Sequence, residues 1–170
     1  MEQAKLAAST LGDATWRRFP FLDGMAPVVE EGHEQILNLT WRPSLSVTGV
    51  GGMPPLADAG NVLRPRTSVK LSLRLAPTAD VEKATAAIKR VLEADPPYGA
   101  HVRFEPDHGG PGWEAPALAP WLDRAQSAAS ETWFGKPACL MGEGGSIPFM
   151  GMLGEKFPEA QFLITGVLGP

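Results

Sequence analysis

The feature that most constrains this chain is a strict two-residue alternation over residues 68–77, SVKLSLRLAP. Val69, Leu71, Leu73 and Leu75 fall on one side of this stretch, and polar residues alternate with them. Because successive side chains of a strand point to opposite faces, the pattern predicts a half-buried β-strand with one solvated face.

A helix is predicted to follow this strand directly, over residues 81–94, with Thr78 or Asp80 as its N-cap. Its apolar residues recur with helical spacing on one face, at Val81, Ala84, Ile88, Val91 and Leu92. Two further stretches have strand character: residues 36–50, interrupted at Pro43, and residues 100–106. The order strand, strand, helix, strand predicts an α+β fold in which helices pack on an antiparallel sheet.

The two ends of the chain have different patterns. Residues 2–12 have helical composition up to Gly12, and residues 20–32 are irregular. A second amphipathic helix is predicted over residues 120–134, and its apolar side carries Leu122, Ala125, Ala129, Thr132 and Trp133. Residues 147–153 are expected to form a short helix. Residues 161–169 are almost continuously apolar, which is typical of a strand buried on both faces in a parallel sheet.

Charge and composition exclude several classes of function. The net charge is −4 and the isoelectric point is near 5.4, so the chain lacks the basic surface of a nucleic-acid-binding protein. A cationic patch for membrane binding is equally absent, and no run approaches 18 apolar residues. Cys139 is the sole cysteine, which rules out a disulfide within the chain. We therefore expect a cytoplasmic protein that binds neither nucleic acid nor membrane.

The sequence predicts no metal site within this chain. His33, His101 and His108 have none of the spacings that metal-binding histidines show, and each is interpreted as a surface or strand residue. Cys139 is interpreted as a buried structural thiol, and the pair Glu30–Glu31 as solvated loop acids.

Two features remain as candidate binding groups. Arg74 lies on the polar side of the predicted strand, where its guanidinium could clamp a carboxylate or simply face solvent. In the segment GEGGSIP at 142–148, Gly144 and Gly145 would let backbone N–H groups approach an anionic oxygen, and Ser146 would add its hydroxyl. The alternative is a plain turn in which Ser146 caps the following helix.

Four segments in order resemble the M20 family of metallopeptidases, and in particular its carnosinase-like dipeptidases and related amidohydrolases. They are TWRPSLSVTGVGG (40–52), NVLRP (61–65), KLSLRLAP (70–77) and MGEGGSIP (141–148). In addition, FLITGVLGP (162–170) resembles the strand that precedes the last metal-binding histidine of that family.

The resemblance implies a domain organisation. Residues 1–35 would form an N-terminal helix and an irregular lead-in, residues 36–135 a ferredoxin-like lid (dimerisation) domain, and residues 136–170 a fragment of an α/β catalytic domain. In this family the catalytic domain binds two zinc ions through His, Asp and Glu, and the lid pairs with a second subunit. The zinc ligands would lie outside this sequence, so the chain alone is expected to be inactive.

The resemblance also assigns roles to individual residues. Arg74 would bind the terminal carboxylate of a dipeptide or N-acyl amino acid, and Asn61 would reach into the site of a partner subunit. Ser146, with Gly144 and Gly145, would line the substrate pocket. We therefore expect a fragment of a zinc-dependent peptidase that self-associates, most simply as a homodimer. The alternative is a free-standing α+β oligomerisation or ligand-binding module without catalysis.

Overall fold

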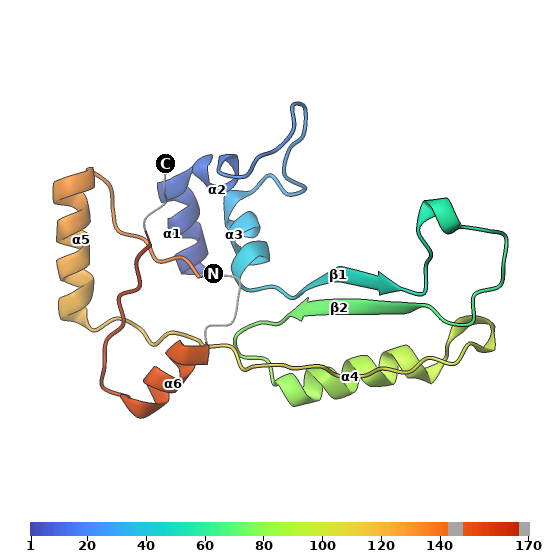
Figure 1. Cartoon of the computed structure of the whole chain (residues 1–170). Coiled ribbons are helices and arrows are strands. Elements are labelled where there is room, and N and C mark those ends of the chain that lie inside the picture. Colours follow the sequence, from blue (N-terminus) through green and yellow to red (C-terminus); the bar gives the residue numbers. More distant parts are fainter. Residues whose placement is uncertain (143–147, 167–170) are drawn as a thin grey trace.

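The computed structural model describes residues 1–142 and 148–166, and it confirms the predicted α+β class. Figure 1 shows a group of helices from which a two-stranded ribbon extends, with one long helix running alongside the ribbon. The elements are α1 (Glu2–Leu11), α2 (Ala14–Arg17), α3 (Gly32–Thr40), β1 (Ser44–Gly51), β2 (Ser68–Arg74), α4 (Val81–Ala94), α5 (Pro120–Phe134) and α6 (Pro148–Lys156). Two single 3-10 turns, η1 (Leu56–Asp58) and η2 (Pro97–Gly99), lie in the connections.

The ribbon is an antiparallel pair in which the apolar side chains of both strands share one face. Leu45 pairs with Leu73 and Val47 with Leu71, while Val50 pairs with Val69. A β-bulge between Val47 and Gly49 adds one residue to β1 and so keeps Val50 in phase with its partner. The strand and its two-sided pattern are thus confirmed for residues 68–74, but the predicted burial is not: Val69 and Leu73 on the apolar face are 51% and 38% exposed.

The helix boundaries follow from local chemistry. The Asp80 carboxylate accepts a hydrogen bond from the backbone N–H of Lys83 at 3.0 Å, which caps α4 as predicted. Helix α1 stops before Gly12, and α5 ends at Gly135, whose φ of 62° is left-handed. These three ends confirm the predicted helices. The four-residue helix α2 was not predicted.

The described core is small and lies in the helical group, which consists of α1, α2 and α3 in mutual contact. Ala4, Ala7 and Ile36 are its buried hydrophobic residues, and Cys139 and Met141 pack against them from the far part of the chain. The total accessible surface is 13759 Å², whereas a compact protein of this mass exposes about 8000 Å². Much of the apolar surface of this chain is therefore exposed.

The expectation of a strand at residues 36–41 is wrong. Residues 36–40 belong to α3, with Trp41 as its C-cap, and Ile36 is only 3% exposed because it packs on Ala4 and Ala7 of α1. The helix–helix contact with α1 decides the conformation, and the short apolar–polar pattern does not. The predicted domain boundary at residue 35 falls inside this helix.

Two other expected strands do not form in the described residues. Residues 100–106 have no strand ladder, because the N–H of Phe104 is bonded to the Glu93 side chain at 2.7 Å and not to a neighbouring strand. Residues 161–166 also lack strand pairing, and Leu163 and Ile164 are 49% and 58% exposed, while residues 167–169 of the predicted strand lie outside the described residues. A parallel strand needs hydrogen-bonded neighbours, and the described chain supplies none here.

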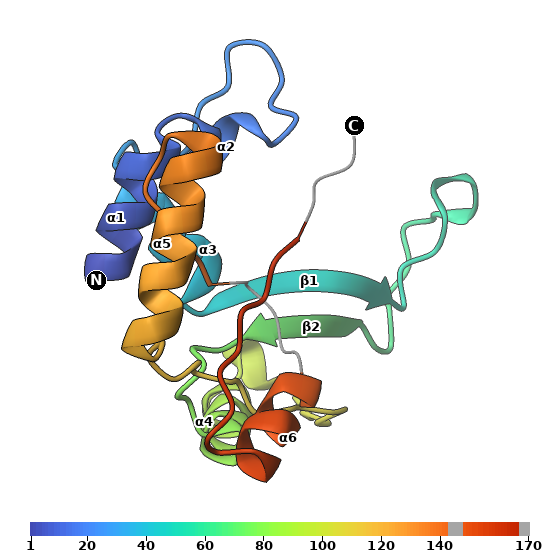
Figure 2. The same ribbon diagram turned by 90° about the vertical axis from the view of Figure 1, so that its left-hand side faces the viewer.

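Seen at right angles to the first view, the residues after α6 run back past α5 towards the level of the helical group (Figure 2). The start of this segment contacts the residues just before α5, since Gln161 Oε1 accepts a hydrogen bond from the N–H of Ala119 at 2.5 Å. Phe162 also stacks edge-on against Trp113, with ring centroids 5.4 Å apart. Among the helices that the structure describes, none is both long and apolar enough to cross a membrane.

Candidate functional site

Arg74 is the last residue of β2 and lies on the polar face of the ribbon, opposite Ser44 of β1. The regular pairing of both strands fixes its backbone position, and the residue is exposed. A guanidinium on such a rigid support can present two parallel N–H groups to a carboxylate. The strand register therefore fixes the position of Arg74 at the end of the polar face of the ribbon.

Asn61 lies at the opposite end of the ribbon, in the loop of residues 52–67 between the strands. Its neighbours Gly60 and Val62 line an open hollow of about 400 Å³, to which Arg64 also contributes. The two sequence neighbours of Asn61 thus line a hollow that also contains a basic side chain.

One copy of the chain does not bring Arg74 and Asn61 together. Strand β2 separates the loop from Arg74, and its seven residues span about 20 Å at the rise of a β-strand. Figure 1 shows the loop at one end of the ribbon and the helical group at the other. A binding site that used both residues would need groups from two copies.

The remaining candidate residues, Ser146, Gly144 and Gly145, lie outside the described part of the chain. The nearest described neighbour is Gly142, where an added Cβ would come within 3.2 Å of the Thr40 side chain at the end of α3. The glycine-rich segment therefore begins beside the helical group.

The described His, Cys, Asp and Glu residues do not form a group of three that could hold a metal ion. His33 pairs with Glu34 at 3.4 Å, and His108 with Asp107 at 3.2 Å. Cys139, interpreted from the sequence as buried, is partly exposed beside the small core.

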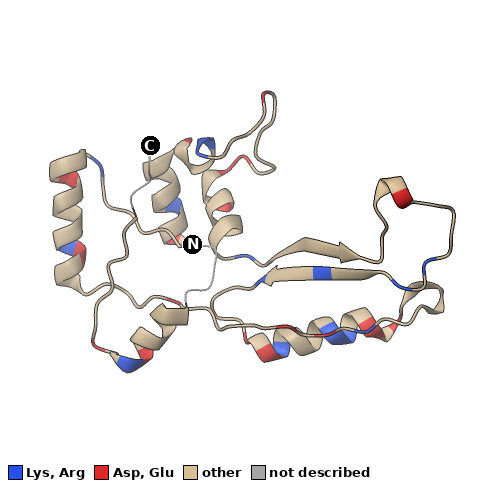
Figure 3. Ribbon diagram, viewed as in Figure 1, with Lys and Arg blue, Asp and Glu red and all other residues tan. Residues whose placement is uncertain are grey.

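The ion pair beside the ribbon holds a loop in place. Figure 3 shows that charged side chains are numerous on α4 and sparse on the two strands. Lys70 of β2 contacts the Asp107 carboxylate at 3.2 Å, which holds residue 107 beside the polar face. Hydrogen bonds from His108 and then from Lys70 lower the pKa of Asp107. Asp107 is therefore a carboxylate that anchors a loop.

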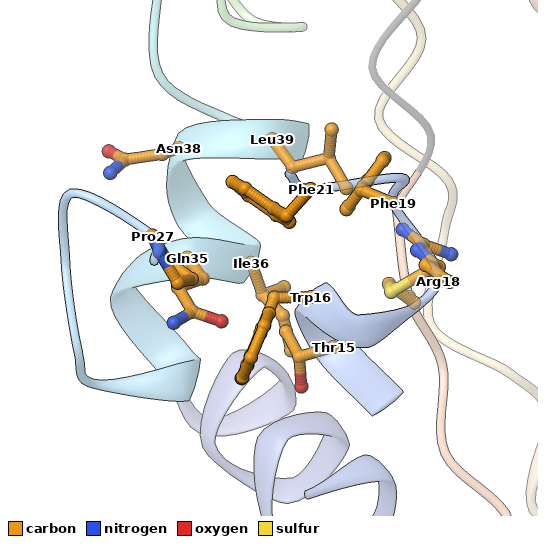
Figure 4. Close-up of a pocket in the computed structure, with 11 residues that line it drawn as sticks. Thr15, Trp16, Arg18, Phe19, Phe21, Pro27, Gln35, Ile36, Asn38 and Leu39 are labelled. Atoms are coloured by element: carbon orange, nitrogen blue, oxygen red, sulfur yellow. The ribbon is translucent and has the colours of Figure 1, made fainter. Parts of the chain in front are cut away.

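A second concave feature is an apolar pocket of about 290 Å³ on the helical group. Figure 4 shows its aromatic side chains, which come from α2 and the loop after it, facing the side chains of α3. Trp16 and Phe21 meet edge to face with centroids 5.8 Å apart. The lining consists of Thr15, Trp16, Arg18, Phe19, Phe21, Pro27, Gln35, Ile36, Asn38, Leu39 and Met141.

Sequence reasoning missed both this pocket and the contribution of Arg64. The signal for the pocket was the dense aromatic stretch WRRFPF at residues 16–21, but its walls include Leu39 and Met141, which are distant in sequence. Arg64 stood in the segment NVLRP, and only the loop conformation shows that it shares a hollow with the neighbours of Asn61.

Comparisons with known proteins show where this sequence and fold occur. No family model matches the chain. The chain is 24% identical over 134 residues to a cysteinylglycine-S-conjugate dipeptidase from Corynebacterium striatum, a match that covers 78% of this chain and 29% of that protein. Its structure matches the crystal structure of human carnosine dipeptidase 1 with a TM-score of 0.53 at 21% identity, over 84% of this chain and 32% of that one. The chain thus shares its fold with about a third of a longer dipeptidase.

Proposed function

We propose that this chain is the substrate-binding and self-associating part of a zinc-dependent M20-type peptidase that hydrolyses the amide bond of dipeptides or N-acyl amino acids. The observation that carries the proposal is the position of Arg74, at the end of β2, in a chain similar to one dipeptidase in sequence and to another in fold. A bidentate guanidinium is a suitable partner for the free carboxylate of such substrates.

The contribution of this chain is binding and orientation. A substrate that is held in place by its carboxylate reacts with a smaller entropic barrier, and the glycine-rich segment with Ser146 would hold its other end. The described residues do not assemble a zinc site, so two zinc ions would be bound by other residues of the complete peptidase. We therefore derive no bond-breaking step from this chain.

Self-association is part of the same proposal. Because β2 separates Asn61 from Arg74 within one chain, a site that includes both residues needs Asn61 from a second copy. Residues 36–135 would then act as the lid (dimerisation) domain. A free-standing module without catalysis is the alternative, and the observation behind it is that the described residues form no metal-binding group of three.

The test is calorimetric binding of cysteinylglycine and of carnosine, the dipeptides in the names of the two similar proteins. We expect weak binding that falls about tenfold or more when the terminal carboxylate is replaced by an amide, and equally when Arg74→Ala is introduced. Arg90→Ala, which removes an exposed arginine from α4, is the matched control and should leave binding unchanged. Equal binding of the acid and the amide would exclude carboxylate recognition by Arg74.

A hydrolysis assay with added zinc separates the two alternatives. The isolated chain is expected to bind dipeptides without cleaving them. Cleavage by the isolated chain would contradict the assignment of the zinc ligands to other residues. Absence of binding, together with self-association, would favour the non-catalytic module.

A further inference from the structure

Residues 107–113 (DHGGPGW) form an irregular segment, here called the strap, that lies beside β2 and the start of α4. The strap begins at the strand, because Lys70 of β2 contacts the Asp107 carboxylate at 3.2 Å. Figure 1 shows the chain after η2 running back along α4, in the same direction as β2 and towards α6. The strap therefore follows β2 towards the end of the strand.

Two glycines let the strap approach the connection between β2 and α4. A Cβ added at Gly112 would lie 2.4 Å from the Cα and 2.7 Å from the carbonyl oxygen of Pro77, and one added at Gly109 would lie 2.6 Å from the Val81 side chain. Non-bonded carbon atoms pack at about 3.5–4.0 Å, so a methyl group at Gly112 would displace the strap or the connection by about 1 Å. The obstacle at Gly112 is backbone, which cannot rotate away as a side chain can.

The last residue of the strap attaches it to the C-terminal part of the chain. The indole of Trp113 lies against Gly154 of α6, where an added Cβ would come within 3.1 Å of the indole nitrogen. The same ring meets Phe162 edge to face, with centroids 5.4 Å apart. Trp113 is partly buried by these contacts. The strap thus joins the connection after β2 to α6 and to the segment that follows it.

Arg74 lies between the two points at which the strap meets β2 and the connection after it. Lys70 and Arg74 are four residues apart in one strand, so they share a face, and Pro77 follows three residues later. The sheet of the described residues has two strands, so β1 supports β2 along one edge only. The contact at Pro77 supports the chain immediately after Arg74.

We propose that the strap positions Arg74 for carboxylate binding and that Gly112 is its positioning residue. The inference rests on the proposed function, because it concerns the same guanidinium. Bidentate pairing requires a fixed orientation of both groups, and a shift of about 1 Å in a positioning group is enough to weaken it. Through Trp113, the position of Arg74 is coupled to that of α6. Each contact lies within one chain, so the inference requires no second copy.

The first test compares calorimetric binding of carnosine with that of its C-terminal amide, since the ratio of the two affinities isolates carboxylate recognition. Gly112→Ala is expected to lower this ratio by about tenfold or more. Gly110→Ala is the matched control, because nothing lies within 4 Å of its added Cβ and neither glycine has a positive φ. A purely structural role of Gly112 would weaken the acid and the amide equally and leave the ratio unchanged.

A second variant tests the other end of the strap and does not depend on the folding of Gly112→Ala. Asp107→Lys replaces the ion pair with a repulsion from Lys70, and both side chains are more than 60% exposed, so the fold should be retained. We expect the ratio to fall by about threefold, the size of an exposed ion pair, and to recover when Lys70→Asp is added. The added positive charge alone would strengthen carboxylate binding. A higher ratio in Asp107→Lys would therefore contradict the positioning role.

NMR measures the coupling without any substrate. Gly112→Ala should shift both the indole N–H of Trp113 and the backbone amide of Arg74, and Gly110→Ala should shift neither. A wild-type preference for the acid that persists unchanged in Gly112→Ala would overturn the positioning role and leave the proposed function intact. Equal binding of acid and amide by the wild type would overturn both, and the NMR shifts would then report a coupling of the strap that serves no carboxylate site.

Discussion

The backbone N–H of Phe104 donates a hydrogen bond of 2.7 Å to the carboxylate of Glu93, eleven residues earlier in the chain. Lys89 contacts the same carboxylate at 2.8 Å from one turn earlier in α4. The carboxylate thus joins the irregular segment after η2 to the helix that runs along the ribbon. This contact occupies the N–H group that a strand at residues 100–106 would have used.

Removal of this acceptor should release the segment from α4. We expect Glu93→Ala to increase hydrogen exchange at the Phe104 amide by about tenfold, because the N–H loses its partner. Glu93→Gln keeps an acceptor oxygen but loses the ion pair with Lys89, so its effect should be smaller. Exchange followed by NMR measures both variants. Equal rates in the wild type and Glu93→Ala would show that the hydrogen bond does not hold the segment.

The same contact should depend on pH in the acid range. The hydrogen bond from Lys89, and after it the N–H of Phe104, hold the pKa of Glu93 below its ordinary value of 4.5. Since the folded-state pKa is the lower one, the stabilisation is present above the unfolded pKa and is lost as the pH falls through the folded value. We expect the amide shift of Phe104 to be constant at neutral pH and to move below 4.5. Glu93→Gln should abolish this titration, and a shift that persists in the variant would assign it to another group.

Sequence reasoning succeeded for elements whose conformation is set by neighbouring residues and failed for those set by tertiary contacts. Strand β2 and the Asp80 cap of α4 were predictable because alternation and capping act within a few residues. Residues 36–41 were misjudged because the contact of Ile36 with α1 is tertiary. Of the candidate site, the strand position of Arg74 followed from the pattern, whereas the place of Asn61 came only from family resemblance. The apolar pocket could not be predicted, since Met141 joins its lining from a hundred residues away.

The turn after β1 depends on a glycine. Gly52 has a φ of 81°, and a Cβ there would collide with the carbonyl oxygen of Arg66. We expect Gly52→Ala to destabilise the ribbon by at least about 1–2 kcal/mol, the cost of a left-handed residue with a Cβ. Gly60→Ala in the same loop is the control, because nothing lies within 4 Å of its added Cβ. Thermal unfolding followed at the strand amides measures both, and equal unfolding temperatures would contradict the strained turn.

The small core of the helical group should be unusually sensitive to loss of volume. Ile36 is 3% exposed and is the largest of the three buried hydrophobic residues described, so Ile36→Ala leaves a cavity that Ala4 and Ala7 are too small to fill. We expect a loss of about 2–4 kcal/mol, which is a large fraction of the stability of any small domain. Leu39→Ala on the same helix removes a side chain that is 41% exposed and should cost less than about 1 kcal/mol. Urea unfolding measures the difference. If the two variants unfolded at the same urea concentration, burial of Ile36 against α1 would not be what holds α3 in place.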